Sequence, residues 1–185
     1  MSRIPTPHID RLARQGLRLT DAHAPASVCV PTRYGLLTGR YPFRSERSER
    51  TESRIEPGRL TLGGFLQKQG YRTACVGKWH QGFEGGKSRK DYSLAIPQGP
   101  IARGFDRFYG TIHGAGSFFD PNSLTRDNTL IAPSDPNYYY TDAISDNAAK
   151  FITEHDSEKP FFMYVAYTAA HWPMHAKPAD IAKYK

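Results

Sequence analysis

The fold is decided by the stretch Phe161-Phe162-Met163-Tyr164-Val165-Ala166-Tyr167, an unbroken apolar run that follows Lys159-Pro160. Runs of this length and character are typical of parallel strands buried on both faces of a sheet. Just before it, Thr141 caps a pattern in which Ile144 and Ala148 recur at helical spacing. A helix followed by a buried strand is the repeating unit of an α/β fold.

The same alternation extends toward the N-terminus. We predict three further helices, over residues 6–16, from just after 29 to 39, and over 61–70. We predict two further strands, at 17–19 and 71–77. Residues 82–136 are rich in Gly, Pro, Asn, Asp and Ser, which predicts long loops with little regular structure. The chain is therefore expected to form one α/β domain, with a mainly parallel sheet flanked by helices on both faces.

The composition is that of a globular protein. The 185 residues are 38% hydrophobic and 23% charged, with a net charge of +7 that favours anionic partners. Much of the charge lies between Arg40 and Arg59, where Arg and Glu alternate, and this predicts an exposed loop. No apolar run approaches the roughly 20 residues that span a bilayer, and the first residues lack the apolar core of a signal peptide.

The two cysteines, Cys29 and Cys75, do not form a disulfide framework or a zinc-finger pattern. Cys29 opens the string Cys29-Val30-Pro31-Thr32-Arg33, at the mouth of a predicted helix. Backbone N–H groups there favour a bound anion and lower the pKa of a thiol, and Arg33 adds a positive charge one turn on. The ordinary alternative is a cysteine packed under a helix end, beside a surface arginine. Cys75 lies inside a predicted strand and is expected to be structural.

Two further groups follow the carboxyl ends of predicted strands, where open α/β sheets bind ligands. After the strand at 71–77 come Lys78 and His80, which would point the same way in an extended chain, one holding an anion and one moving a proton. After the strand at 161–167 comes His171, with His175 expected to lie farther from the chemistry. Each could instead be an ordinary surface lysine or turn histidine; together they suggest an oxyanion site, without separating phosphate from sulfate.

The string Cys29-Val30-Pro31-Thr32-Arg33, followed after four residues by Thr38-Gly39, resembles the sulfatase signature Cys-x-Pro-Ser/Thr/Ala-Arg-x4-Thr-Gly. Other blocks agree in order, and they are residues 6–13, 77–80, 104–110 and 171–173. The chain is similar to arylsulfatase-A-like members of the alkaline phosphatase superfamily over almost its whole length, and the resemblance implies an alkaline-phosphatase-like fold and a sulfuric ester hydrolase.

The resemblance implies a role for each candidate residue. Cys29 would be oxidised by a formylglycine-generating enzyme, and the resulting aldehyde would hydrate to a gem-diol that binds Ca2+ and attacks sulfur. Arg33 would stabilise the diol, and Lys78 would hold the diol and a sulfate oxygen. His80 would take the proton that releases sulfate. His171 would contact sulfate and help protonate the leaving oxygen.

The resemblance also has departures. The first strand of the family, with paired metal-binding aspartates, is expected before Thr6, and the later Asp-Asn pair on the metal is expected beyond the last residue. Asp127-Asn128 lies in the wrong place and is interpreted as a loop, and for a serine common after the Gly-Phe-Asp block, Gly114 or Ser117 is nearest. We therefore expect residues 1–185 to be a truncated N-terminal catalytic domain, inactive alone, in which only Cys29 (as formylglycine) belongs to the calcium shell.

Two other functions compete with a sulfatase. One is a phosphatase or phosphodiesterase of the same superfamily, and the other is a catalytically incomplete domain that binds sulfated glycans. The expected partners are a sulfate ester, such as a sulfated polysaccharide, and the formylglycine-generating enzyme; nucleic acid and a membrane span are not expected. The family implies a periplasmic or secreted location, or a lysosomal one in a eukaryote.

Overall fold

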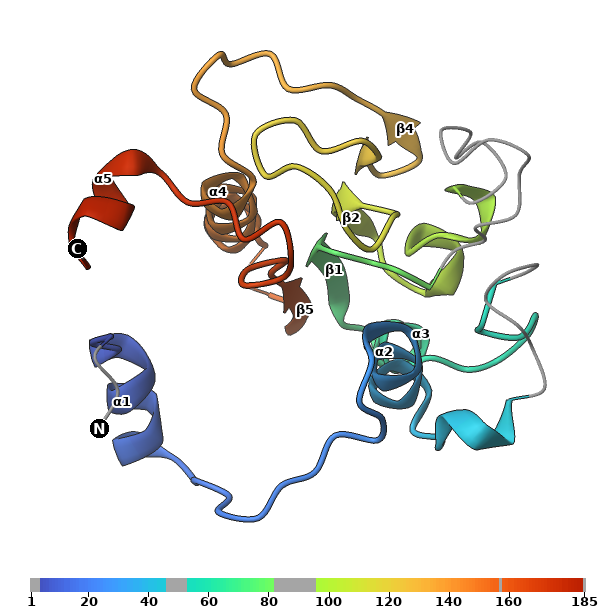
Figure 1. Ribbon diagram of the computed structural model, residues 1–185. Helices are drawn as coiled ribbons and strands as arrows, with labels where there is room; N and C mark the ends of the chain where they lie inside the picture. The colour runs from blue at the N-terminus through green and yellow to red at the C-terminus, as the bar shows by residue number, and fades with distance from the viewer. Residues whose placement is uncertain (1–3, 46–52, 82–95, 157, 185) are drawn as a thin grey trace.

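A computed structural model describes residues 4–45, 53–81, 96–156 and 158–184 of the protein. At its centre is a five-stranded sheet in the order β4-β3-β2-β1-β5 (Figure 1). The strands are β1 (Arg72–Gly77), β2 (Arg107–Thr111), β3 (Leu124–Arg126), β4 (Thr129–Leu130) and β5 (Phe161–Ala166). β1 pairs in parallel with both β2 and β5, whereas β3 and β4 form an antiparallel hairpin at one edge.

Helices cover both faces of this sheet, as the sequence predicts. One face packs against α2 (Cys29–Thr38), with Tyr34, Leu37 and Cys75 in a shared core. The helix α3 (Leu62–Lys68) lies on the same side, and α4 (Tyr140–Thr153) covers the other face, where Val76 and Ile144 are buried (Figure 1). Successive strand residues point to opposite faces, so neighbours on β1 enter different cores. The α/β prediction is confirmed.

The strand predicted at 161–167 is present, but it is not buried on both faces. Phe161 is 40% exposed, and of the strand's residues only Ala166 is fully buried. The reason is its place in the sheet, because β5 is an edge strand of the described part and only β1 pairs with it.

Two predictions about local structure are wrong. Residues 17–19 do not form a strand, and Leu17 and Leu19 are 85% and 69% exposed. The segment predicted as loop contains β2, β3 and β4 together with two short 3-10 helices, Ile96–Gln98 and Ile101–Arg103; residues 82–95 of that prediction lie outside the described residues. Short strands interrupted by Gly and Asn carry too little apolar periodicity to be recognised.

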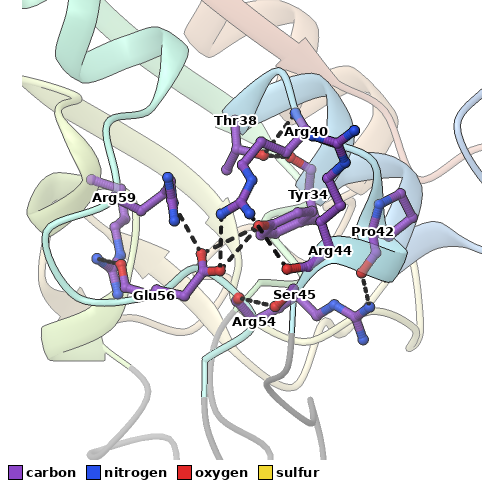
Figure 2. Close-up of polar contacts among 10 residues, drawn as sticks. Tyr34, Thr38, Arg40, Pro42, Arg44, Ser45, Arg54, Glu56 and Arg59 are labelled. Carbon is purple, nitrogen blue, oxygen red and sulfur yellow. Dashed lines mark hydrogen bonds and ion pairs between the residues drawn. The ribbon is translucent and has the colours of Figure 1, made fainter.

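The charged stretch between Arg40 and Arg59 is only partly an exposed loop. It includes a short 3-10 helix, Pro42–Arg44, and its residues Ser53 and Ile55 are 1% and 0% exposed. Glu56 lies next to them, accepts hydrogen bonds from Tyr34 and Arg59, and is 3.6 Å from Arg40 (Figure 2). The Glu56 carboxylate thus connects the arginine-rich segment to Tyr34 of α2. Burial tends to raise the Glu56 pKa, but hydrogen bonds and the Arg59 charge outweigh it and lower the pKa.

Three helix predictions hold in outline. The helix α3 forms where it is expected, and the Thr61 hydroxyl caps it by accepting from the backbone N–H of Gly64 at 3.0 Å. The helix α4 also forms, but Thr141 is not its cap, because the helix begins one residue earlier and Tyr139 is the N-cap residue, without a side-chain cap. The N-terminal helix α1 (Pro7–Gln15) also forms, but none of its residues is buried. The last element is α5 (Pro178–Ala182). Among the described helices, none combines the length and apolar character needed to cross a membrane.

Candidate active site

Cys29 is the first residue of α2, and its side chain is half-buried. Val28, the N-cap residue, is extended and makes no side-chain cap, so the first turn keeps backbone N–H groups directed at this end. The chain before the helix is held in place because the Thr32 hydroxyl donates to the Ala26 carbonyl at 2.6 Å. The sequence prediction of a cysteine at a helix mouth is confirmed.

Lys78 brings the end of β1 to this helix mouth. Its backbone N–H donates to the Ala166 carbonyl of β5 at 2.8 Å, and its side chain is buried at 2% exposure. The ammonium group is hydrogen-bonded to the Cys29 side chain. Burial lowers the Lys78 pKa, Cys29 opposes that shift, and the positive charge of Arg33 adds to it.

Arg33 holds the backbone of Lys78 in place. Its Nη1 donates to the Lys78 carbonyl at 2.7 Å and to the Tyr164 hydroxyl at 3.0 Å. The guanidinium is therefore fixed by β1 and β5 together, one turn along α2 from Cys29. Of the two cations, Lys78 contacts the motif cysteine, and Arg33 holds the backbone of Lys78.

His80 is held by the chain that follows β2. Trp79 N–H donates to Thr111 at 2.9 Å and His80 N–H donates to Ile112 at 3.1 Å, so the pairing continues beyond the strands. His80 has a φ of 51°, so the expectation that it continues an extended chain from Lys78 is wrong. The Lys78 charge nevertheless acts on His80, since burial first and then that charge lower the His80 pKa to about 3. At neutral pH the imidazole is uncharged.

The two later histidines separate as the sequence predicts. His171 is exposed, its Nδ1 lies 2.7 Å from the Trp172 carbonyl oxygen, and its charge is among those that lower the His80 pKa. His175 instead accepts a hydrogen bond from Phe118 N–H at 3.3 Å, and its ring lies against Phe119. His171 thus lies near enough for its charge to act on His80, whereas His175 packs against Phe118 and Phe119.

Sequence reasoning missed His113 and Gln81, and it considered Gly114 only as the nearest match to a serine of the family. The His113 ring centroid lies 6.1 Å from that of His80, and Gly114 lies directly against the His80 ring. Buried Gln81 donates from Nε2 to the Val30 carbonyl at 2.6 Å, which ties the chain after His80 to α2. His113 and Gly114 follow a strand end, so the rule that found Lys78 would have found them had β2 been predicted.

Other motif residues have structural roles. The Asp106 carboxylate accepts from Thr73 N–H at 2.9 Å and from Gln67 at 2.7 Å, which joins α3 to β1. Asp127 lies in the turn of the β3–β4 hairpin with φ 53°, and it accepts from Phe108 N–H, as the loop interpretation expects. Cys75 is fully buried, and burial raises the pKa of its thiol.

The described residues lack a cluster of side chains that could bind the expected Ca2+ ion. Within the described ranges, no group of three or more His, Cys, Asp or Glu side chains could hold a metal ion. The side chain of Cys29 contacts a cation, Lys78, whereas Ca2+ takes six to eight oxygen ligands. The described residues do not by themselves form a calcium site.

A groove of about 600 Å³ lies at the opposite end of the sheet from these groups. It is lined by Arg72, Arg107, Arg126 and Lys150, among others, near the amino ends of β1 and β2. None of the candidate catalytic residues lines it. The chemistry therefore gathers at the carboxyl ends of the parallel strands, as expected for an open α/β sheet.

The whole chain, residues 1–185, matches the protein-family model described as Sulfatase. The chain belongs to the sulfatase family. It is 32% identical to Arylsulfatase J of Mus musculus over 190 residues, which cover 95% of this chain and 30% of that protein. The sequence-based identification is thereby confirmed, as is its place in the alkaline phosphatase superfamily.

Solved structures agree with this assignment. The crystal structure of Ps i-CgsB in complex with k-i-k-neocarrahexaose has a TM-score of 0.76 and 28% identity, covering 96% of this chain and 42% of that one. The structure of BT4656 with its substrate D-glucosamine-2-N,6-O-disulfate has a TM-score of 0.75 and 27% identity, covering 98% of this chain and 33% of that one. This sulfatase chain thus spans less than half the length of these relatives.

Proposed function

We propose that the protein is a sulfuric ester hydrolase in which Cys29 is the site of the nucleophile. The observation that carries the proposal is the contact between the Lys78 ammonium and the Cys29 side chain at the N-terminus of α2. A sulfate ester places spread negative charge on its oxygens, and fixed cations in a partly buried site stabilise that charge most strongly. Lys78 and Arg33 are such cations, and both are anchored through backbone or strand contacts.

In this proposal the two histidines handle protons. His80 is neutral at pH 7, so one of its ring nitrogens could take a proton as a base, but the positive charges around it oppose that protonation. A bound anion would offset those charges and raise the His80 pKa toward the operating range. His171 is exposed at the rim, where it could reach the leaving oxygen of an ester whose sulfate lies against Lys78.

The modification and the metal remain part of the proposal. Formylglycine, made from Cys29 by a formylglycine-generating enzyme, would supply the attacking oxygen, and the half-buried position of Cys29 would let it react. Within the chain, Lys78 and Arg33 would orient the modified residue. Calcium at Cys29 would need oxygen ligands besides the side chains described. The family suggests an exported protein.

Sulfated carbohydrates are the proposed substrate class. The chain carries a net charge of +7, which favours polyanions. Of the two solved structures described above, Ps i-CgsB was solved with k-i-k-neocarrahexaose and BT4656 with a sugar bearing two sulfate groups. Both observations support a sulfated glycan over a small aryl sulfate.

The test is to produce the protein at its full natural length with a formylglycine-generating enzyme and to weigh the peptide containing residue 29. We expect the mass loss of thiol-to-aldehyde conversion, abolished by Cys29→Ala and Arg33→Ala but retained in Cys75→Ala, the matched cysteine control. Sulfate release from sulfated oligosaccharides should require the same Cys29. Binding of those oligosaccharides without release, with Cys29 unmodified, would instead favour a glycan-binding domain, and release of phosphate would favour a phosphatase.

A further inference from the structure

The ring of His80 occupies the place that a side chain on residue 114 would take. A Cβ atom on Gly114 would lie 2.0 Å from Cε1, 2.2 Å from Nε2 and 2.3 Å from Nδ1 of His80. Distances this short are far inside van der Waals contact. All three of the nearest atoms belong to His80, so the clash is with this imidazole in particular.

The backbone of His80 has little room to yield. Its N–H is bound to Ile112 at 3.1 Å, and the preceding Trp79, at 0% exposure, is bound to Thr111. The partner strand end is fixed as well, because the backbone N–H of His113 donates to the Ser123 hydroxyl at 2.9 Å, and Ser123 is 1% exposed. With both backbones held, a side chain at residue 114 would have to displace the imidazole itself.

A displaced imidazole would move relative to the groups that handle the substrate. Lys78 and Arg33 lie close enough for their charges to act on His80, and the His113 ring flanks it at a centroid distance of 6.1 Å. Proton transfer depends steeply on the distance and direction between donor and acceptor. His80 can therefore act in proton transfer only if its ring keeps this position.

We infer that Gly114 is a positioning residue, whose missing side chain lets the His80 imidazole lie against its backbone, beside the His113 ring. The inference rests on the proposed function, in which His80 is the base. Gly114 itself touches neither the reacting atoms nor the sulfate; it acts only through the ring. Any residue larger than glycine at 114 should mislocate that ring.

A double-variant cycle tests the inference on the full-length protein. Gly114→Ala should lower sulfate release by about 10²-fold, as expected for a misplaced catalytic group, and should lower the melting temperature. In a His80→Ala background, where the ring is gone, Gly114→Ala should change neither quantity further. The control is Gly116→Ala in the same loop, where the new Cβ would meet only the end of the Asn122 side chain at 3.2 Å, so activity should be retained.

The His80 ring can also be followed directly by its imidazole NMR resonances, assigned with His80→Gln. These resonances should move in Gly114→Ala and stay in Gly116→Ala. Equal losses of melting temperature from Gly114→Ala with and without His80 would overturn the inference. The stability cycle and the resonances do not need turnover, so they judge Gly114 even if Cys29 proves unmodified and the proposed function fails.

Discussion

Arg33 on α2 donates a hydrogen bond to the Tyr164 hydroxyl on β5 at 3.0 Å, across 131 positions of sequence. The same guanidinium nitrogen holds the Lys78 carbonyl, so one side chain joins the signature helix to two neighbouring strands. Burial raises the Tyr164 pKa, and the nearby Arg33 charge opposes that shift. The tyrosine is thus a neutral acceptor that fixes a cation of the site.

Tyr164→Phe should lower the free energy of unfolding by about 1 kcal/mol, because it removes one partly buried hydrogen bond to a charged group. It should also lower sulfate release, since Arg33 loses one of its two anchors. The matched control is Tyr167→Phe, which removes a hydroxyl that lies 2.8 Å from Ser145 at an exposed position. Urea unfolding of both variants checks the prediction, and an equal loss from Tyr167→Phe would contradict it.

Gly77 ends β1 at the point where the strands lead into the site. Its φ is 110°, and a Cβ there would lie 2.2 Å from the Ala166 carbonyl oxygen. Gly77→Ala should therefore cost about 3 kcal/mol or more, since backbone strain adds to a backbone clash. Gly70→Ala, at φ 85° with nothing within 4 Å, carries strain alone and should cost about 1–2 kcal/mol. Similar melting temperatures for the two variants would show that β5 can move away.

The sequence predicts the parts of this fold whose apolar pattern is strong. β1 is buried along most of its length and β5, although an edge strand, is a continuous apolar run, so both carry an apolar pattern that predicts a strand. β2 contains Gly110, where a Cβ would lie 1.8 Å from the Gly77 carbonyl oxygen, so close packing there replaces the side chain that would mark a strand. At residues 17–19, the strand prediction depends on two leucines alone, and in the structure this segment is exposed and pairs with no strand of the described sheet.

The candidate site divides along the same line. Cys29 could be found because it opens a predicted helix, and Lys78 and His171 because each follows a predicted strand. His113 could not, since it follows β2, and the role inferred for Gly114 could not either. The contact between Gly114 and His80 depends on the absence of a side chain at residue 114, which a sequence motif does not reveal. Only the structure shows that the His80 ring fills the space that a Cβ atom on residue 114 would need.

Acid should weaken the junction between α3 and β1 at Asp106. Burial tends to raise the Asp106 pKa, but hydrogen bonds from Thr73 and Gln67 outweigh it and hold the pKa below its ordinary value. The unfolded chain then binds a proton more readily than the folded one, so stability is full above the ordinary pKa of about 4 and is lost as pH falls below it.

Asp106→Asn should accordingly cost about 1–2 kcal/mol at pH 7. The gap between wild type and variant should narrow as the pH falls from about 5 to 3, when wild type loses the same charge. Asp146→Asn, on the exposed side of α4, serves as the control and should follow wild type throughout. Thermal unfolding across this pH range gives the comparison, and a constant gap would mean that the Asp106 charge does not matter.

Lys78 offers the sharpest separation of function from stability. Its ammonium is buried at 2% exposure, where burial lowers the pKa and the charge costs desolvation energy. Its side chain contacts the Cys29 side chain rather than a carboxylate, so removing the charge leaves no buried carboxylate behind. Lys78→Met, which keeps the length and apolar stem, should leave the free energy of unfolding within about 1 kcal/mol of wild type or raise it.

The same variant should reduce sulfate release by about 10²-fold or more, because a fixed cation next to the nucleophile stabilises charge only as the reaction proceeds. Lys68→Met, at an exposed position in the last turn of α3, should change neither stability nor release. Unfolding curves and sulfate assays on the full-length proteins decide the matter. If Lys78→Met unfolds several kcal/mol more easily, Lys78 is needed for packing, and its loss of activity says nothing of catalysis. If it stays folded and inactive, the buried charge is retained for the reaction alone.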